Sequence, residues 1–398
     1  MMNPAPSAPQ QKPKGIQMLS IRQFAHLAQV DLSLGDLTVL VGPQGVGKSL
    51  ALQWLKVALD GKHVVAALHS AGHPTDRPEA LMDLLFGSGM ASAWKEGLSQ
   101  VSLHNQSITL QNLSRIGASA EQVLFIPAHR SLLLADGWAL PFQKLGAETP
   151  AVARLFSQQL FDQFNTKNAG QLFPLETKFA PEIQQKIDDA IFHGGRVGME
   201  EDARQHTKRL GLRHGTEVCL PYQTWTAGQR EFTPLMLGLY RLLLPQHSLA
   251  SSEIQWVVIE EPEMGLHPKA ITAVLLLVLN LVARGHRVVL ATHSPHVLTL
   301  LWMMRRLQEC GSSWTLVCDA FDLPHSLAMR EMAETALTKN FKAHAFQFMR
   351  DSSQIESIDI SSLDPDAQDM VTAEWGGLTE YASRFGAAVR QAVNESAT

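Results

Sequence analysis

A glycine-rich segment near the start of the chain contains residue types that bind phosphate. It consists of Gly42, Pro43, Gln44, Gly45, Val46, Gly47, Lys48 and Ser49. Glycines let the backbone curl so that successive N–H groups point at a phosphate, and the lysine adds a positive charge. The Ser49 hydroxyl is a ligand of the kind that Mg²⁺ takes. The segment therefore predicts a nucleotide-binding loop, with a glycine-rich turn that binds no nucleotide as the alternative.

Two adjacent carboxylates form a second candidate group. Glu260 and Glu261 come directly after the apolar run 256–259, which predicts a buried strand. Two carboxylates at the end of a buried strand are costly unless a cation compensates them. We expect Glu260 to hold the hydration shell of Mg²⁺ and Glu261 to polarise an attacking water. An ordinary strand end with two solvated carboxylates is the alternative.

Two further segments could bring groups to a phosphate. His293 follows the apolar run 288–290, where an imidazole could contact a γ-phosphate and the water, or serve only as a structural histidine. Thr226, Gly228 and Gln229 precede a helix that the spacing predicts over 231–244. The free N–H groups and the dipole of a helix N-terminus attract anions. A simple helix cap is the alternative.

The elements that position these groups alternate between strands and helices. Apolar and polar residues alternate over 16–24 and 30–34, and apolar strands are expected at 37–41, 123–126, 256–259 and 288–290. A helix is expected over 50–59, directly after the glycine-rich segment. The apolar run 271–282 is shorter than the roughly 20 residues that cross a bilayer, so it predicts a buried helix and no membrane partner.

In their order along the chain, these motifs resemble those of an ABC-type ATPase. The branch includes the overcoming-lysogenization-defect and RecF-like proteins, often grouped as AAA-15 or AAA-21 ATPases. Residues 42–49 resemble the Walker A loop, 257–262 the Walker B strand, 226–229 the ABC signature, 264–268 the D-loop, and His293 the switch histidine. The form E-E-P-E-x-x-L-H-P over 260–268 is similar to that branch in particular. The resemblance covers about residues 16–295 and implies an α/β P-loop NTPase fold of ABC type with an inserted helical lobe.

The resemblance also implies an activity, namely hydrolysis of ATP with Mg²⁺. It makes Lys48, Glu261 and His293 catalytic, and Ser49 and Glu260 ligands of the metal. It adds Thr226, Gly228 and Gln229 to the glycine-rich segment as nucleotide-binding residues, although T-A-G-Q stands where S-S-G-Q or S-G-G-Q is typical. Two copies would then face head to tail, each closing the other's nucleotide site, in a homodimer or a higher oligomer.

Arg130 follows the strand expected at 123–126. Residues 126–130 resemble an I-P-A-x-R segment often seen in this branch, which implies a γ-phosphate or lobe-coupling role for Arg130. An ordinary surface arginine at a strand end is the alternative.

The same patterns divide the chain into five parts. We expect a disordered tail over 1–14, the first part of the ATPase core over 15–130, an inserted helical and β lobe over 131–221, the second part of the core over 222–300, and an α/β completion of the core over 301–398. Helical spacing is expected over 132–164 and 181–191, and short strands over 194–220. A final amphipathic helix is expected to end near residue 393.

Composition limits the classes of partner. The chain has 398 residues, 45% hydrophobic and 18% charged, so a disordered or fibrous chain is excluded. With a formal net charge of -5, contact with DNA would have to come from a local patch, an assembled oligomer or a partner. A basic cluster of Arg196, Arg204, Lys208, Arg209 and Arg213 is such a patch, or else a solvated face balanced by Glu200, Glu201 and Asp202. Three cysteines without metal-ligand spacing fit a cytoplasmic location.

The resemblance implies that ATP hydrolysis drives a conformational switch. The effector that this switch controls is expected on another protein. Asp364 and Asp366 spell D-x-D, as in a nuclease metal site, but Pro365 between them favours a turn. The chain resembles the ATPase subunits of two-gene anti-phage systems such as Septu and PARIS, so we expect a defence ATPase that controls a separate nuclease. A RecF-like DNA repair ATPase and a nucleotide-dependent scaffold with weak hydrolysis are the alternatives.

Overall fold

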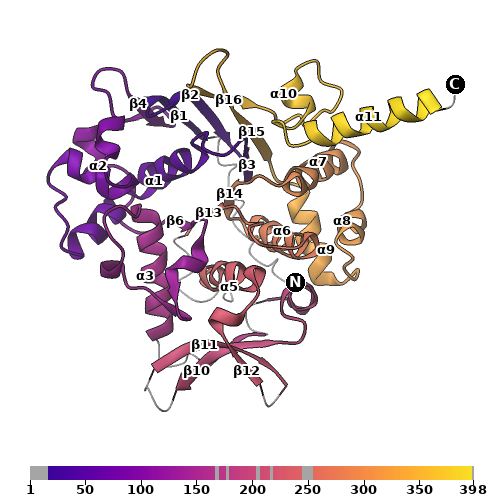
Figure 1. Ribbon diagram of the computed structural model, residues 1–398, viewed down its shortest axis with the longest axis horizontal. Helices are drawn as coiled ribbons and strands as arrows, with labels where there is room; N and C mark the ends of the chain where they lie inside the picture. Colours follow the sequence, from indigo (N-terminus) through magenta and orange to yellow (C-terminus); the bar gives the residue numbers. More distant parts are fainter. Residues whose placement is uncertain are drawn as a thin grey trace, which may run out of the picture.

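Ten strands form one mixed sheet through the middle of the part of the chain that the structure describes (Figure 1). The computed structural model describes residues 17–165, 170–175, 179–202, 207–215, 218–243 and 254–396, so the tail expected over 1–14 lies outside it. The spatial order of the strands is β5-β4-β1-β2-β16-β15-β3-β14-β13-β6. Their bounds are β1 (Gln17–Phe24), β2 (Leu27–Leu34), β3 (Leu37–Val41), β4 (Gln100–Leu103), β5 (Gln106–Ile108), β6 (Val123–Ile126), β13 (Trp256–Glu260), β14 (Arg287–Ala291), β15 (Phe341–Phe348) and β16 (Ile355–Asp359).

The centre of this sheet is parallel. β15, β3, β14, β13 and β6 pair in parallel with one another in this order, and every residue of β3, β6, β13 and β14 is buried. A parallel strand covered on both faces must be apolar along its whole length, which is why these four segments are continuous apolar runs. The strands expected from those runs are confirmed. Their carboxyl ends lie along one edge of the sheet.

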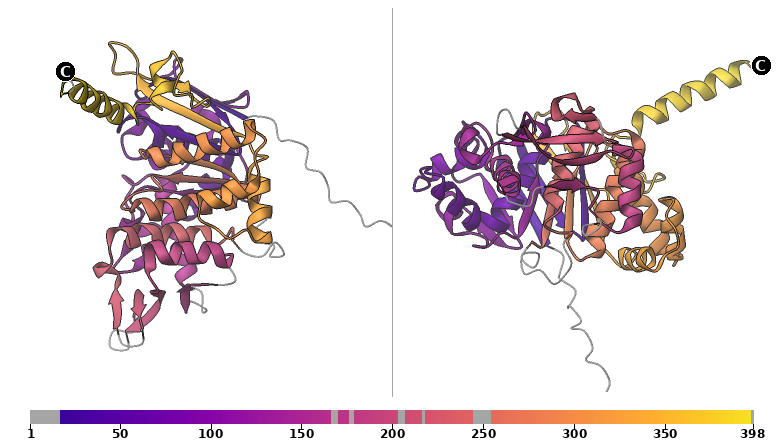
Figure 2. Two further views of the ribbon diagram at one scale, coloured as in Figure 1. Left: turned by 90° about the vertical axis from the view of Figure 1, so that its right-hand side faces the viewer. Right: turned by 90° about the horizontal axis from the view of Figure 1, so that it is seen from below.

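Helices cover both faces of the sheet (Figure 2). One hydrophobic core packs α1 (Lys48–Ser70) and α2 (Pro78–Phe86) against the face that carries Leu40, Val258 and Val289. The other packs α5 (Ala227–Leu239), α6 (Pro268–Ala283), α7 (Pro295–Glu309), α8 (Trp314–Ala320) and α9 (Leu327–Ala336) against the opposite face. α6 is the buried helix expected over 271–282, and among the described residues no helix is long and apolar enough to cross a membrane.

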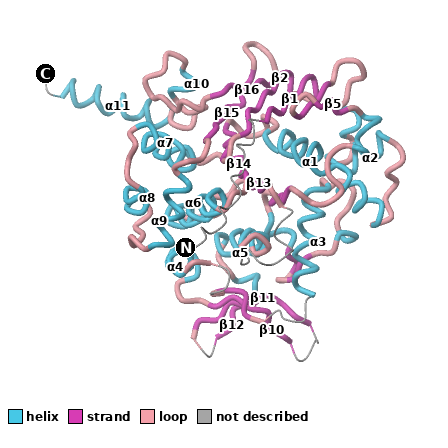
Figure 3. The backbone as a smooth tube through the Cα atoms, turned by 180° about the vertical axis from the view of Figure 1, so that it is seen from behind, coloured by secondary structure: helices cyan, strands magenta, loops and turns pink. Residues whose placement is uncertain are grey.

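A lobe between β6 and α5 is built mainly on an antiparallel sheet (Figure 3). It contains β7 (Leu134–Ala135), β8 (Trp138–Ala139), α3 (Ala151–Asn165), β9 (Gln171–Phe173), α4 (Pro181–Ile187), β10 (Arg196–Asp202), β11 (Thr207–His214) and β12 (Val218–Pro221). The helical prediction over 132–164 is wrong before Ala151, because Gly137 takes a positive φ in the β7–β8 hairpin and prolines at 141 and 150 interrupt the helix. The strands expected over 194–220 are confirmed.

The basic cluster lies on this lobe and is paired with acids. Arg213 donates to the Glu200 carboxylate at 2.7 Å, and the register sets Glu200 opposite Arg209 and Glu201 opposite Lys208 across β10 and β11. The balanced solvated face is therefore the better description of these residues. Arg204 lies outside the described residues.

Helix α1 is longer than expected. The spacing predicts its end near residue 59, whereas it continues to Ser70 across a non-helical Asp60 (φ -124°, ψ 16°). The Asp60 carboxylate there accepts the amides of Gln122 and Val123, both at 2.9 Å, and the Lys56 ammonium at 2.8 Å. These bonds compensate the broken turn and tie α1 to the start of β6.

Helix α5 also differs from its expected bounds. It begins at Ala227 rather than 231 because Thr226 caps it, and it ends at Leu239, while residue 244 lies outside the described residues. Pro234 inside the helix has no N–H, and the Arg230 carbonyl accepts the Tyr222 hydroxyl at 3.1 Å instead.

The chain ends in two helices, α10 (Met370–Ala373) and α11 (Glu380–Ser396), the second being the amphipathic helix that was expected. Before them, Asp366 donates its amide to the Asp364 carboxylate at 3.1 Å in a turn, as Pro365 predicts. The residues that the structure describes hold no cluster of three or more His, Cys, Asp or Glu suited to a metal ion.

Replacing Asp60 by alanine should destabilise the fold strongly. The change leaves two amides without their acceptor and removes one of the two carboxylates that pair with the buried Lys56 ammonium, which costs about 3 kcal/mol. Urea unfolding measures the loss. Glu334→Ala, which breaks an exposed pair with Arg330, is the matched control and should cost less than about 1 kcal/mol. Equal losses in the two variants would contradict this account of α1.

Candidate functional site

The glycine-rich segment links β3 to α1 in a conformation that two of its glycines make possible. Gly42 has φ 137°, and a Cβ there would lie 2.3 Å from the Phe346 carbonyl oxygen of β15. Gly47, at the N-terminus of α1, has φ 84°, and a Cβ there would lie 2.6 Å from Leu27. Both positions therefore exclude a side chain. The turn holds its shape by packing against β15 and β2.

Lys48 reaches back over this turn. Its ammonium donates to the carbonyls of Gly42 at 2.7 Å and Pro43 at 2.8 Å, and the side chain is buried. Burial lowers the pKa of Lys48 to about 8, against the opposing effect of the nearby carboxylates of Glu261 and Glu263. The lysine is charged at neutral pH and titrates in the mildly alkaline range.

Glu260 is the last residue of β13, and one oxygen of its buried carboxylate has no hydrogen-bond partner. Oε2 accepts the Ala128 amide at 3.1 Å, and the Ser49 hydroxyl also donates to the carboxylate. Oε1 is buried and has no hydrogen-bond partner. Burial raises the pKa of Glu260, because a charged carboxylate is poorly solvated here. A cation beside Oε1 would relieve this cost, so Glu260 and Ser49 fit a Mg²⁺ ion as the sequence suggests.

Glu261 and His293 face each other across the ends of β13 and β14. Their side chains approach to 3.9 Å between Oε1 and Nε2, and both are partly exposed. Glu261 has φ 42°, unusual for a residue with a side chain, and its amide donates to the Ala291 carbonyl at 2.8 Å. This bond turns the chain out of β13 and sets Glu261 beside the end of β14.

Glu263 holds the loop that carries His293. Its Oε1 accepts the His293 amide and the Thr292 hydroxyl, both at 2.7 Å. Burial and the positive charge of Lys48 lower the pKa of His293, while Glu261 and Glu263 act in the opposite direction. The imidazole is therefore neutral at pH 7 and able to accept a proton.

These groups line one cleft with a volume of about 480 Å³. Its lining from the expected site consists of Gln44, Gly45, Val46, Gly47, Lys48, Ser49, Glu260, Glu261 and His293. Gly42 and Pro43 lie behind the lining, where their carbonyls hold Lys48. Strand β3 and the strands β13 and β14, which follow it by more than 200 residues in the sequence, thus bring their loops to one place.

The signature segment lies elsewhere. The Thr226 hydroxyl caps α5 by accepting the Gln229 backbone amide at 3.3 Å. The Gln229 side-chain oxygen in turn accepts the Thr226 backbone amide at 3.2 Å. Thr226, Gly228 and Gln229 do not line the cleft of their own chain. A Cβ at Gly228 would lie 3.0 Å from the Gly265 carbonyl, so this glycine lets α5 pack closely on the D-loop segment. Within its own chain the segment therefore forms the helix cap that was the alternative prediction, and Thr226 and Ala227 are exposed.

Arg130 does not lie in the cleft. It is fully buried, which rules out both the surface arginine and a direct phosphate contact in this conformation. Its guanidinium donates to the carbonyls of Glu260 at 3.0 Å, of Glu261 at 3.4 Å and of Glu231 at 2.9 Å. Arg130 therefore connects the loop after β13 to α5, and its lobe-coupling role stays a prediction.

Three site residues escaped the sequence analysis. His26 lies in the β1–β2 turn and His129 follows β6, and both line the cleft. The Nε2 atom of His26 is buried without a hydrogen-bond partner. A histidine in a turn has no spacing to distinguish it, so these two positions needed the tertiary structure. Glu263 could have been found, because it is the third glutamate of the E-E-P-E run.

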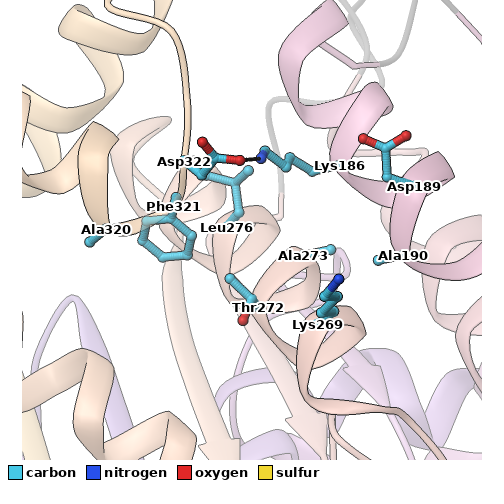
Figure 4. Close-up of a pocket in the computed structure, with 10 residues that line it drawn as sticks. All are labelled: Lys186, Asp189, Ala190, Lys269, Thr272, Ala273, Leu276, Ala320, Phe321 and Asp322. Carbon is cyan, nitrogen blue, oxygen red and sulfur yellow. Dashed lines mark hydrogen bonds and ion pairs between the residues drawn. The ribbon is translucent and has the colours of Figure 1, made fainter.

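A second hollow of about 330 Å³ lies between α4, α6 and the connection after α8 (Figure 4). An ion pair of 2.7 Å between Lys186 and Asp322 spans it, and Lys269 and Asp189 stand at its sides. None of the expected site residues lines this hollow. The chemistry described above therefore belongs to the cleft at the sheet edge.

Comparison with known proteins finds sequence matches that cover parts of the chain. Residues 118–299 match the family model AAA_21, described as "AAA domain, putative AbiEii toxin, Type IV TA system". A segment of 165 residues, 40% of the chain, is 25% identical to the Old nuclease of Escherichia phage P2. The match spans 26% of the length of that curated relative.

Solved structures with some likeness include heads of SMC proteins and an ABC cassette. The SMC head bound to the C-winged helix domain of ScpA is 11% identical over 86% of this chain and 97% of its own, with a TM-score of 0.42. The SMC head domain from Thermotoga maritima is 11% identical over 86% and 98%, with a TM-score of 0.39. A dimeric bacterial ABC transporter cassette is 14% identical over 70% and 90%, with a TM-score of 0.31.

Replacing Lys48 by methionine should raise the pKa of His293. The neutral stem keeps the packing but removes one of the two causes that hold this pKa below its ordinary value. The titration of the His293 ring signals by NMR in the nucleotide-free protein measures the change, with His293→Gln used for assignment. Lys62→Met, an exposed lysine that does not line the cleft, should leave the titration unchanged. A pKa of His293 that stays or falls in Lys48→Met would show that the two groups do not interact.

Proposed function

We propose that this chain is an ABC-type ATPase that binds ATP with Mg²⁺, hydrolyses the γ-phosphate and works as a nucleotide-driven conformational switch. The observation that carries the proposal is the meeting of Lys48, Glu260, Glu261 and His293 in one cleft at the carboxyl ends of β3, β13 and β14. A cation, a buried carboxylate, a partly exposed carboxylate and a neutral imidazole together suit phosphoryl transfer to water.

Ser49 and Glu260 are the residues that would hold Mg²⁺. The unpartnered Oε1 of Glu260 and the hydroxyl beside it supply two oxygen ligands, and Mg²⁺ commonly takes one or two protein ligands with water and phosphate oxygens. Bound there, the ion would neutralise charge on the phosphates.

The other residues divide the remaining work. Lys48 exchanges its bonds to the Gly42 and Pro43 carbonyls for phosphate oxygens, which is favourable because its charge is poorly compensated before the nucleotide arrives. Glu261 orients the attacking water and accepts its proton. His293, 3.9 Å from Glu261 and held through its amide by Glu263, contacts the γ-phosphate.

Closure of the site by a second copy completes the proposal. Thr226 and Gly228 sit at the N-terminus of α5, where free N–H groups attract an anion, yet they do not line the cleft of their own chain. A head-to-tail dimer in which each signature segment caps the other chain's nucleotide would use both. Arg130 then links the state of the loop after β13 to the position of α5.

We further propose that the switch regulates a separate nuclease in an anti-phage system. The match to part of the phage P2 Old nuclease and to the AAA_21 model supports this class of ATPase. Asp364 and Asp366 form a turn instead of a pair at a strand end, so the nuclease chemistry is assigned to a partner protein.

Glu261→Gln should keep ATP binding and lower turnover by a factor of about 10² or more, because the amide cannot accept the proton of the water. Lys48→Ala should lose binding itself. Steady-state phosphate release and equilibrium binding of ATP with Mg²⁺ separate the two effects. Unchanged turnover in Glu261→Gln would leave a nucleotide-dependent scaffold as the function. In infected cells, both variants should lose any protection that the wild-type chain and its neighbouring genes confer.

Two inactive variants should complement each other if the sandwich forms. Lys48→Ala removes the phosphate loop of one copy, and Gly228→Asp blocks the signature of the other, so a mixed dimer keeps one complete site. Mixing them should restore up to about half of the turnover per mixed dimer, whereas each variant alone stays inactive. Wild-type turnover in Gly228→Asp by itself would remove the signature segment from the site.

A further inference from the structure

The imidazole of His129 lies at the cleft and has no partner among the described residues. His129 is exposed and comes three residues after the end of β6. It is also the N-cap of the short 3₁₀ helix Arg130–Leu133, yet its side chain makes no hydrogen bond to that helix. A cap residue commonly uses its side chain for a free amide of the helix. The ring of His129 is instead available to a ligand in the cleft.

The strand order fixes where His129 stands among the site residues. β13 lies between β14 and β6, and all three strands run parallel. In an open parallel sheet, ligands bind beyond the carboxyl ends of the strands. His293 follows β14 and His129 follows β6, while Glu260 and Glu261 stand at the end of β13. The loops that carry the two imidazoles therefore lie on either side of the loop after β13.

The residues beside His129 in the chain are both bonded to Glu260. The Ala128 amide donates to Glu260 Oε2 at 3.1 Å, and the buried Arg130 guanidinium donates to the Glu260 carbonyl at 3.0 Å. Glu260 is the residue proposed above to hold Mg²⁺, and this ion bridges the β- and γ-phosphates of a nucleotide. His129 is therefore held at the end of the cleft where the terminal phosphate would lie.

The backbone of His129 has an unusual conformation that these bonds fix. Its φ is 49° and its ψ is 31°, in the left-handed region. Residues with a side chain rarely adopt this region, although histidine does so more often than most. Such a conformation persists only where the surrounding structure determines it, and it is common at ligand-binding sites. The bonds of Ala128 and Arg130 supply that constraint and leave the imidazole in the cleft.

We propose that a ring N–H of His129 donates a hydrogen bond to the γ-phosphate of the bound nucleotide. This inference rests on the function proposed above, because the contact needs a triphosphate in the cleft. An imidazole has an N–H donor in its neutral and in its protonated form, so the contact does not depend on one charge state. His129 would bind the phosphate from the side of β6, and His293 from the side of β14.

The contact gives the site a means to distinguish ATP from ADP. The phosphate loop binds phosphates that both nucleotides possess, whereas ADP has no γ-phosphate for His129 to reach. A donor that meets only the terminal phosphate contributes to the binding of ATP alone. Loss of the imidazole should therefore change the ratio of the two affinities.

Equilibrium binding to His129→Gly tests the proposal. Glycine adopts a φ of 49° without strain, so the variant should unfold at a temperature no lower than that of the wild type. With Mg²⁺ present, its dissociation constant for a non-hydrolysable ATP analogue should rise about tenfold, and that for ADP should stay unchanged. His129→Asn also tolerates the left-handed region and keeps an N–H donor, so it should recover part of the lost affinity.

His104→Gly is the matched control. His104 is also exposed, has a φ of 47° in the turn between β4 and β5, and does not line the cleft. The change removes an imidazole from the same kind of backbone position. Its affinities for the ATP analogue and for ADP should both equal those of the wild type.

Two results would overturn the inference about His129 alone. An unchanged affinity of His129→Gly for the ATP analogue would show that the imidazole does not contact the phosphate. Equal losses for the analogue and for ADP would place the contact on a part that both nucleotides share. In both cases the wild type still binds and hydrolyses ATP, so the ATPase assignment stands. A wild type that binds neither nucleotide would instead overturn the proposed function, and the role of His129 with it.

Discussion

Parallel pairing of β3, β14 and β13 is the constraint on which the site depends. The register joins Leu40 to Ala291 and Ala291 to Glu260, so the three strands end at the same level of the sheet. Each strand is buried over its whole length, which fixes the register because a slip by one residue would exchange the two apolar faces. The loops that follow the three strands therefore lie at the same edge of the sheet. Residues more than 200 positions apart consequently share one cleft.

A second set of contacts holds those loops in place through backbone groups. Arg130 binds the carbonyls after β13, and Glu263 binds the His293 amide, while Lys48 spans the phosphate loop. All three side chains bond main-chain groups, and Glu263 also accepts the Thr292 hydroxyl. Glu260 Oε1 and Glu263 Oε2 are both buried carboxylate oxygens without a donor. Of these two residues only Glu260 lines the cleft, so its oxygen is the one placed for an additional cation.

The signature segment differs from the other expected site segments in its position. The N-terminus of α5 carries exposed Thr226 away from the cleft of its own chain. It packs on the D-loop segment, since a Cβ at Gly228 would lie 3.0 Å from the Gly265 carbonyl. The head-to-tail dimer proposed above would bring this segment to the nucleotide of a second copy.

The sequence by itself determined the features that depend only on residues close together in the chain. Continuous apolar runs specify buried parallel strands, and glycine, lysine and serine at Walker spacing specify the loop after β3, because each depends on neighbouring residues alone. The extension of α1 across Asp60 depended on amides more than 60 residues away. The burial of Arg130 and the presence of His26 in the cleft likewise depended on the packing of distant elements. Only tertiary structure decides these features, because a charged or polar side chain takes its role from partners that the fold brings to it, and spacing along the chain does not encode them.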